Sequence, residues 1–103
     1  MLKILSKFAG FDWDEGNKNK NWIKHRVLDA ECEEIFFNIP LVVFPDKAHS
    51  KGEERHYVLG KTNRGRLLFL VFTPRGDKIR IISARDMSKK ERRCYYESQK
   101  SHS

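Results

Sequence analysis

The sequence has few cysteines and no long hydrophobic run. Its two cysteines, Cys32 and Cys94, lie far apart and match no zinc-binding spacing. We therefore expect reduced thiols and exclude a zinc finger or a disulfide scaffold. No apolar stretch approaches the ~18 residues that a membrane-spanning helix needs. Residues 1–10 also lack the unbroken ~7–15-residue apolar stretch of a signal peptide. These absences predict a cytoplasmic protein with no membrane contact.

What the sequence does have is aromatic residues and an uneven distribution of charge. Seven Phe, three Tyr and two Trp in 103 residues argue against disorder, and the length predicts a single domain over 1–103. Residues 1–60 carry nine Lys or Arg and ten Asp or Glu, whereas residues 61–103 carry twelve and four. The C-terminal part therefore has a net charge of +8, which would attract a nucleic acid or an acidic protein. The alternative is that this charge serves solubility alone.

The N-terminal half predicts one short strand and two helices. The strand is expected at 8–13, and Asp14 is expected to cap a helix that ends at about His25. Asp29 is expected to cap a second helix, which Pro40 ends. The apolar residues of this second helix have helical spacing and form one stripe: Leu28, Cys32, Ile35, Phe36 and Ile39.

The C-terminal half changes to strand patterns. Short apolar or alternating runs at 41–44, 55–60, 67–72 and 79–84 are separated by a polar loop at 45–52 and by tight turns. Ser88 and Glu91 have the spacing of a capping box, which predicts a final helix to about Ser98 with Cys94 and Tyr95 facing inward. The predicted fold class is α+β, in which helices pack on a mostly antiparallel sheet of four to five strands.

Four short motifs follow one another along residues 8–97. They are F-D-W-D at 11–14 with Lys18, Asn21 and K-H at 24–25, E-E-R at 53–55 with Gly60, R-I-I-S-A-R at 80–85, and E-R-R at 91–93 with Tyr95. In this order they resemble the motifs of the BrnT family, the toxin half of a type II toxin–antitoxin pair. The sequence departs from the family at Arg26, where a glycine usually follows the K-H motif. A glycine there would suit a left-handed helix end, so either Arg26 holds that conformation at a cost of about 1 kcal/mol or the helix ends differently.

The resemblance implies both an activity and a partner. It implies a fold similar to the RelE toxins and a small endoribonuclease that stops translation by cleaving RNA. It also implies a cognate BrnA-like antitoxin with a DNA-binding domain, in a hetero-oligomer that reaches operator DNA only through the antitoxin. Two alternatives stay open, a non-catalytic nucleic-acid-binding module and an inactive toxin that serves as antitoxin partner and corepressor.

An RNase that uses the 2′-hydroxyl as its nucleophile needs a base, an acid and cations that stabilise the pentacoordinate phosphorus. The histidines are scattered and no metal-ligand cluster is visible, so we expect no metal and no cofactor. The expected catalytic residues are Lys24, His25, Glu54, Arg55 and Arg85. Each has a structural alternative: His25 as a helix-end cap, Lys24 and Glu54 as solvated residues, and Arg55 and Arg85 as ion-pair partners.

The expected RNA-binding residues are Arg75, Lys78, Arg80 and Tyr95. Arg75 and Lys78 could equally serve solubility, Arg80 could pair across the sheet, and Tyr95 could simply pack. Arg80 and Arg85 are five positions apart, so in a regular strand they would point to opposite faces. Trp13 and Trp22 could stack on bases, but we expect both to be structural.

Overall fold

The computed structural model describes residues 8–47 and 52–101. The first seven residues and part of the loop expected at 45–52 therefore lie outside the described residues. The elements follow one another as β1 (Gly10–Phe11), α1 (Lys20–His25), α2 (Asp29–Glu34), the 3-10 helix η2 (Ile35–Phe37), β2 (Val42–Pro45), β3 (His56–Lys61), β4 (Leu67–Arg75), β5 (Lys78–Asp86) and α3 (Lys89–Ser101).

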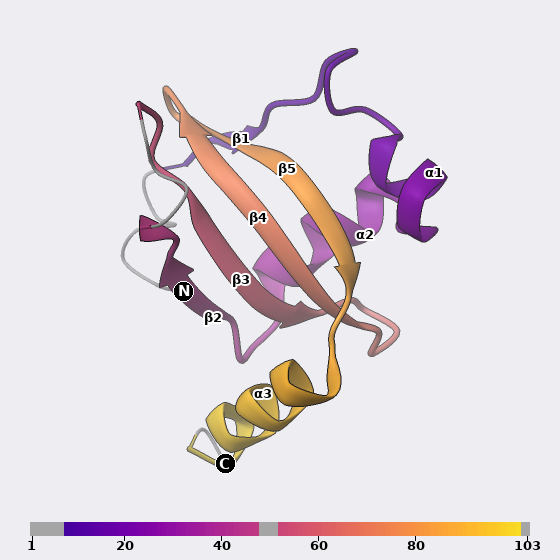
Figure 1. Cartoon of the computed structure of the whole chain (residues 1–103), viewed down its shortest axis with the longest axis vertical. Coiled ribbons are helices and arrows are strands. Elements are labelled where there is room, and N and C mark those ends of the chain that lie inside the picture. Colours follow the sequence, from indigo (N-terminus) through magenta and orange to yellow (C-terminus); the bar gives the residue numbers. More distant parts are fainter. Residues whose placement is uncertain (1–7, 48–51, 102–103) are drawn as a thin grey trace.

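The five strands form one sheet in the order β1-β5-β4-β3-β2 (Figure 1). Strands β2 to β5 pair antiparallel with their neighbours, and β1 pairs parallel with β5. The expected meander and the α+β class are confirmed. The β4–β5 hairpin is longer than the sequence pattern indicated, because its strands continue to Arg75 and Asp86.

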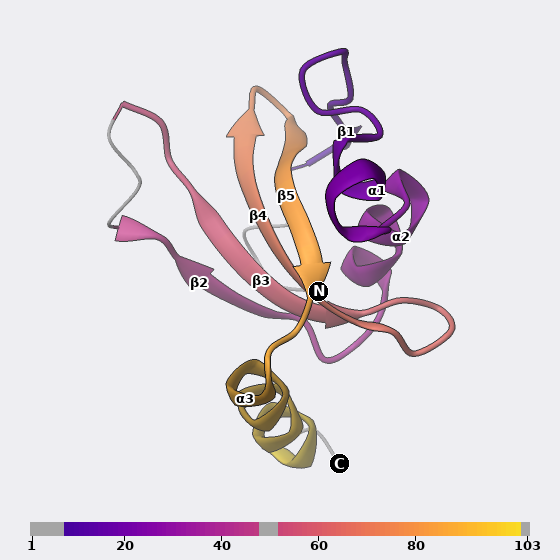
Figure 2. The ribbon, with the colours of Figure 1, turned by 45° about the vertical axis from the view of Figure 1, so that its right-hand side comes forward.

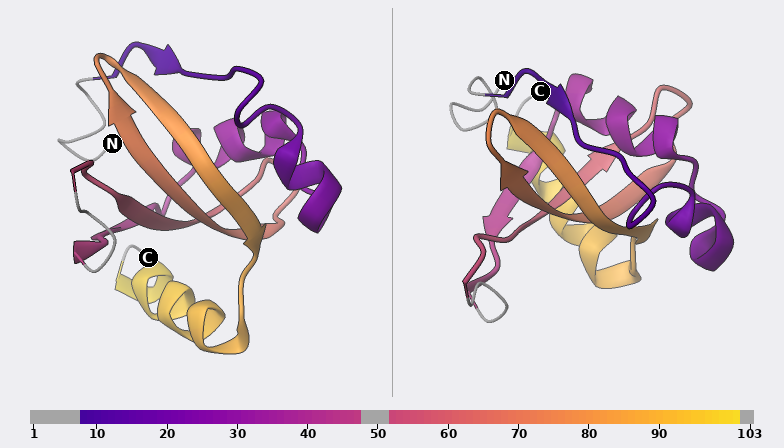
Figure 3. Two further views of the ribbon diagram at one scale, coloured as in Figure 1. Left: turned by 45° about the horizontal axis from the view of Figure 1, so that its top comes forward. Right: turned by 90° about the horizontal axis from the view of Figure 1, so that it is seen from above.

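The helices lie on both sides of the sheet. Helices α1, α2 and η2 cover one face, which we call the helix-covered face, and α3 lies across one end of the opposite face (Figures 2 and 3). Cys32, Ile35 and Phe36 of the helices pack on alternate residues of the strands to form the main core. A second cluster on the opposite face contains Leu59, Met87 and Tyr95. The rest of that second face, which α3 leaves uncovered, is called the open face below.

The first helix is shorter than expected, and Asp14 does not cap it. Helix α1 begins at Lys20, after Asn19 adopts a left-handed conformation with φ 58°. The Asp14 carboxylate instead accepts the N–H of Gly16 at 2.8 Å. The Asn17 side chain donates to the carbonyls of Asp12 and Ile81, at 2.9 and 3.1 Å. These bonds anchor the segment before α1 to strand β5 and compete with helix formation there.

The second helix departs from its predicted stripe at both ends. Helix α2 is capped at Leu28, whose N–H donates to the Glu31 carboxylate at 3.0 Å, so Asp29 is the first residue within the helix and not its cap. Cys32, Ile35 and Phe36 are buried as expected. Leu28 is 49% exposed, because it is the extended cap residue before the helix. Ile39 is 71% exposed, because the helix tightens into η2 and ends before it.

Arg26 adopts the left-handed conformation that its position implied, with φ 56° and ψ 38°. Its guanidinium lies 5.3 Å from the ring centroid of Trp22. Trp22 is 41% exposed, so it lies at the surface, where it contacts Arg26, and not in the core. Trp13 packs against the main core and donates its indole N–H to Glu33 at 2.6 Å.

The final helix begins as predicted. The Ser88 N–H donates to the Glu91 carboxylate at 2.8 Å, and the Glu91 N–H donates to the Ser88 hydroxyl at 3.2 Å. Tyr95 is fully buried, and its hydroxyl donates to the carbonyl of Pro40 at 2.7 Å. Cys94 is exposed, so its predicted inward packing is wrong. Neighbouring positions on a helix point about 100° apart, and Tyr95 occupies the buried side.

Candidate functional site

An irregularity in strand β5 decides which side chains share the open face. Ser83 is in register with Val71 and Ile81 with Phe72, so Ile82 is an extra residue, a β-bulge. The bulge shifts the alternation by one residue. Ile79 and Ile81 before it and Ala84 after it all face the helices. Arg80 and Arg85 therefore both lie on the other face, and the prediction that they point to opposite faces is wrong.

The register places five of the predicted cationic residues on this second face. Arg80 is opposite Thr73, Arg85 is opposite Phe69, and Lys78 is opposite Arg75. Cross-strand partners share a face, so Tyr57 lies on the same face as its partner Val71. Arg55 is two residues before Tyr57 and therefore points to that face as well. The set is Arg55, Arg75, Lys78, Arg80 and Arg85.

Arg75, Arg80 and Arg85 are each paired with a carboxylate. Arg75 contacts Glu53 at 3.1 Å, Arg80 contacts Asp14 at 2.9 Å, and Arg85 contacts Glu91 at 2.8 Å. The hydrogen bond from each arginine lowers the pKa of its partner below the ordinary value of that carboxyl group. The carboxylates therefore stay charged at neutral pH. A phosphate that binds these arginines has to compete with an existing anion.

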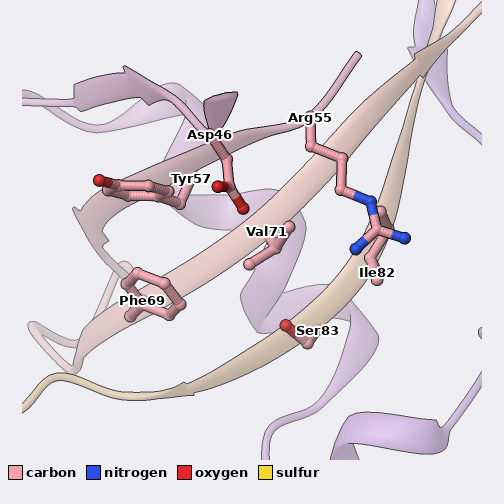
Figure 4. Close-up of a pocket in the computed structure, with 7 residues that line it drawn as sticks. All are labelled: Asp46, Arg55, Tyr57, Phe69, Val71, Ile82 and Ser83. Carbon is pink, nitrogen blue, oxygen red and sulfur yellow. The ribbon is translucent and has the colours of Figure 1, made fainter. Parts of the chain in front are cut away.

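A hollow of about 360 Å³ lies on the open face. Asp46, which follows β2, and Arg55, which precedes β3, reach over the sheet at this point, and the Arg55 guanidinium extends toward Ile82 (Figure 4). The backbone N–H of Asp46 donates to the carbonyl of Arg55 at 2.9 Å, which holds the two positions together. The lining residues are Asp46, Arg55, Tyr57, Phe69, Val71, Ile82 and Ser83.

A second hollow of about 300 Å³ lies between the sheet and the first turns of α3. Tyr57 and Phe69 line both hollows, which therefore adjoin along these two rings. Lys90 and Cys94 of α3 form part of the wall of the second hollow. The open face thus combines an aromatic floor with cationic side chains at its rim.

Arg85 makes several contacts on this face. Its two terminal nitrogens donate to the two Glu91 oxygens at 2.8 and 2.9 Å, and one of them also donates to the carbonyl of Asp86 at 3.1 Å. Its guanidinium lies 4.1 Å from the ring centroid of Phe69. These contacts support the predicted structural alternative for Arg85. They also hold its charge directly beside both hollows.

The remaining predicted catalytic residues lie away from the hollows. The Glu54 carboxylate is 3.9 Å from Nε2 of His56, whose ring stacks on Phe72 of the main core. Lys24 and His25 are the exposed last residues of α1, on the helix-covered side. The structure does not bring Glu54, Lys24 and His25 together with Arg55 on the open face.

Arg66 joins the end of α1 to the end of β5. Its guanidinium contacts the Asp86 carboxylate at 2.7 Å, the Glu31 carboxylate at 3.1 Å and the carbonyl of His25 at 3.4 Å. The hydrogen bond from Arg66 lowers the pKa of Asp86. The backbone of His25 is therefore held near Asp86, the residue that follows Arg85. His25 itself lies on the helix-covered side of the sheet, whereas the hollows lie on the open face.

The predicted RNA-binding residues are also separated. Arg75 and Lys78 are exposed at the β4–β5 turn, and Arg80 is bound at the β1 edge by Asp14 and Asp12. Tyr95 has no exposed surface, and burial raises its pKa to about 12. Its geometry favours the packing alternative over contact with RNA.

Several residues of this face had no role in the sequence-based prediction: Asp46, Phe44, Tyr57, Phe69, Ser83 and Lys90. Tyr57 and Phe69 were assigned to strands, but nothing assigned them to a common surface. The alternation along residues 55–60 places Arg55 and Tyr57 on one face of that strand, but it does not show which residues of β4 and β5 share that face. The position of Ser83 depends on the bulge, for which the sequence carries no clear signal.

The described residues, 8–47 and 52–101, carry neither a metal-ligand cluster nor a membrane-spanning helix. No group of three or more His, Cys, Asp or Glu side chains is placed to hold a metal ion within these ranges. None of the helices described there has the length and apolar character needed to cross a bilayer.

Comparison with known proteins assigns the class. Residues 13–91 match the family described as the ribonuclease toxin BrnT of type II toxin–antitoxin systems, which places the chain among ribonuclease toxins. The structure is similar to the 1.1 Å crystal structure of the Brucella abortus ribonuclease toxin BrnT, with a TM-score of 0.58 and 28% sequence identity. The match covers 78% of this chain and 97% of the Brucella chain. No match was found among proteins with curated descriptions.

The chain belongs to the BrnT family, as the sequence motifs indicated. Membership of a type II toxin–antitoxin family implies an antitoxin partner. The observed α+β fold agrees with that assignment.

Proposed function

We propose that this chain is a metal-independent endoribonuclease that inhibits translation by cleaving RNA on its open face. The observation that supports the proposal most directly is that Arg55 lines a hollow of this face and Arg85 lies over Phe69 at its edge. Guanidinium groups bind two phosphate oxygens at once and remain charged. Their charge would serve where other nucleases use a metal ion.

In the proposed reaction the 2′-hydroxyl of RNA attacks the adjacent phosphorus, and the bond from phosphorus to the 5′-oxygen breaks. The hydroxyl proton goes to a base, and the leaving 5′-oxygen receives a proton, which leaves a 2′,3′-cyclic phosphate and a 5′-hydroxyl. Arg55 and Arg85 would stabilise the charge that develops on the phosphorane. Asp46 is the carboxylate that lines the hollow with Arg55, so it is the candidate base on this face, whereas the predicted bases Glu54 and His25 lie away from it.

Cleavage of a single-stranded RNA in excess chelator tests this proposal. We expect chelator-resistant cleavage that a 2′-deoxy substitution at the cleaved nucleotide abolishes. Arg55→Gln should lower the rate, while Arg64→Gln should not, because Arg64 is an exposed arginine of the β3–β4 turn. Loss of cleavage in chelator, restored by a divalent ion, would contradict the metal-free mechanism.

A second function is favoured by the ion pairs of the open face. Because Arg75, Arg80 and Arg85 are already paired with carboxylates, the chain could act as a non-catalytic binding module or as an inactive antitoxin partner and corepressor. RNA binding without cleavage would support the binding module. Antitoxin binding without either RNA binding or cleavage would support the corepressor.

The antitoxin is proposed to be BrnA-like, with a DNA-binding domain through which the pair reaches operator DNA in the cytoplasm. The net charge of +8 in residues 61–103 favours an acidic surface on this partner. Association should then be fast and should slow as salt is raised. An on-rate that does not change with salt would refute the electrostatic argument.

A further inference from the structure

The open face carries a continuous row of aromatic side chains across three neighbouring strands. Phe44 of β2 and Tyr57 of β3 have ring centroids 5.2 Å apart, and Tyr57 and Phe69 of β4 have centroids 5.6 Å apart. The planes within each pair are tilted by 30° and 33°. The guanidinium of Arg85 on β5 extends the row by covering Phe69.

This row is more than a part of the core beneath α3. Phe44 and Phe69 pack against the cluster of Leu59, Met87 and Tyr95, but Tyr57 is not among the residues of that cluster. Tyr57 nevertheless lies between the two phenylalanines and lines both hollows of the open face. An aromatic ring that lines two adjoining hollows is available to a ligand on either side.

Each hollow also has a cation in its wall. Arg55 lines the first hollow together with Asp46, and Lys90 lines the second together with Glu91, so a cation and a carboxylate lie on each side of the aromatic pair. Their volumes of about 360 and 300 Å³ fall at the small end of the range for small-ligand pockets. Apolar surface between two cations matches the chemistry of a nucleotide strand, whose bases alternate with phosphates.

We infer that two unpaired, neighbouring bases of single-stranded RNA lie against Tyr57 and Phe69, one in each hollow, with their phosphates at the cations. The inference deepens the proposed function, since it rests on RNA as the ligand of this face. Bases in a duplex are paired and stacked, so they cannot reach a side-chain floor. Duplex RNA is therefore excluded, and Tyr57 selects single strands.

Binding of a short 2′-O-methyl oligonucleotide tests this inference, because the blocked 2′-oxygen prevents cleavage during the measurement. Tyr57→Leu should weaken binding by roughly 5- to 150-fold, the range expected when one base loses its aromatic partner. Tyr57→Trp should retain it. Tyr96→Leu is the matched control, since Tyr96 is an exposed tyrosine of α3 that lines neither hollow. Thermal unfolding of each variant confirms that it is folded.

Changes in the oligonucleotide complete the experiment. An oligonucleotide with two adjacent abasic positions should bind the unmodified protein weakly, and Tyr57→Leu should add little to that loss. Duplex binding as tight as single-strand binding, or unchanged affinity in folded Tyr57→Leu, overturns the inference. Base-dependent binding without cleavage of ordinary RNA would refute the ribonuclease proposal and leave the base site standing. Cleavage of ordinary RNA together with binding that does not depend on the bases would refute the base site and leave the ribonuclease proposal standing.

Discussion

Replacing Arg85 by alanine separates a catalytic role from a structural one. In the folded protein its side chain is 39% exposed, makes two hydrogen bonds to Glu91 and covers the ring of Phe69. Arg85→Ala removes the ion pair and the cation–π contact together. A purely structural arginine would affect only stability, whereas a cation that stabilises the transition state would affect the cleavage rate of the folded protein as well.

Both effects have a size that the contacts define. A partly exposed ion pair contributes about 0.5–1 kcal/mol and an exposed cation–π contact about the same, so Arg85→Ala should cost about 1–2 kcal/mol of stability. In a domain of this size that lowers Tm by roughly 4–16 °C. If Arg85 stabilises charge in the transition state, Arg85→Ala should raise the activation free energy of cleavage by about 2–4 kcal/mol. The cleavage rate should then fall by roughly 30- to 1000-fold. Arg85→Lys should recover little, because a point charge cannot bind two oxygens as a guanidinium does.

The assay measures thermal unfolding and single-turnover RNA cleavage on the same purified variant. Glu91→Gln is the matched control, since glutamine keeps the capping geometry but loses the ion pair with Arg85. It should lose about half as much stability as Arg85→Ala, since the contact with Phe69 remains, and it should still cleave RNA. A destabilised Arg85→Ala protein that cleaves at the full rate per folded molecule would remove Arg85 from the reaction.

Three further predictions concern stability. Arg26→Gly should be about 1 kcal/mol more stable than Arg26→Ala in chemical denaturation, because φ is 56° there and both variants lose the same side-chain contact. Gly60→Ala should cost about 1–3 kcal/mol, since the new Cβ would lie 2.9 Å from the Cβ of Ile35; an unchanged Tm would contradict this close approach. The pKa of Glu91 and of Asp86 is lowered in the folded state, so their stabilisation is present above the unfolded pKa near 4 and disappears as pH falls through the folded values. The Tm of the protein should therefore decrease as the pH is lowered below about 4. The Tm of Glu91→Gln should decrease less steeply over the same pH range.

The sequence alone predicted the class and most of the sheet. The apolar and alternating runs specified the β3–β4–β5 meander, and Ser88 with Glu91 specified the start of α3. The family resemblance left two alternatives for Arg26, a left-handed conformation or a different helix end, and the structure shows the left-handed one. These features depend on local patterns, which a linear sequence displays directly.

The helix boundaries could not be predicted as well. The prediction of a long first helix was wrong because the side chain of Asn17 donates a hydrogen bond to the carbonyl of Ile81, a residue distant in sequence. The second helix lacks Leu28 in its buried stripe because Leu28 is the extended cap residue, and it lacks Ile39 because η2 ends the α-helical period before that residue. Competing tertiary contacts of this kind leave no periodic signal within the segment itself.

By itself the sequence determined the family, the order of the strands along the chain and the excess of positive charge in its C-terminal part. Only the tertiary structure decided which cations share a face. The bulge at Ile82 adds one residue without a cross-strand partner and thereby turns Arg80 and Arg85 to the same side. Alternation along a strand predicts direction only while the pairing is regular, and pairing is a property of two strands together.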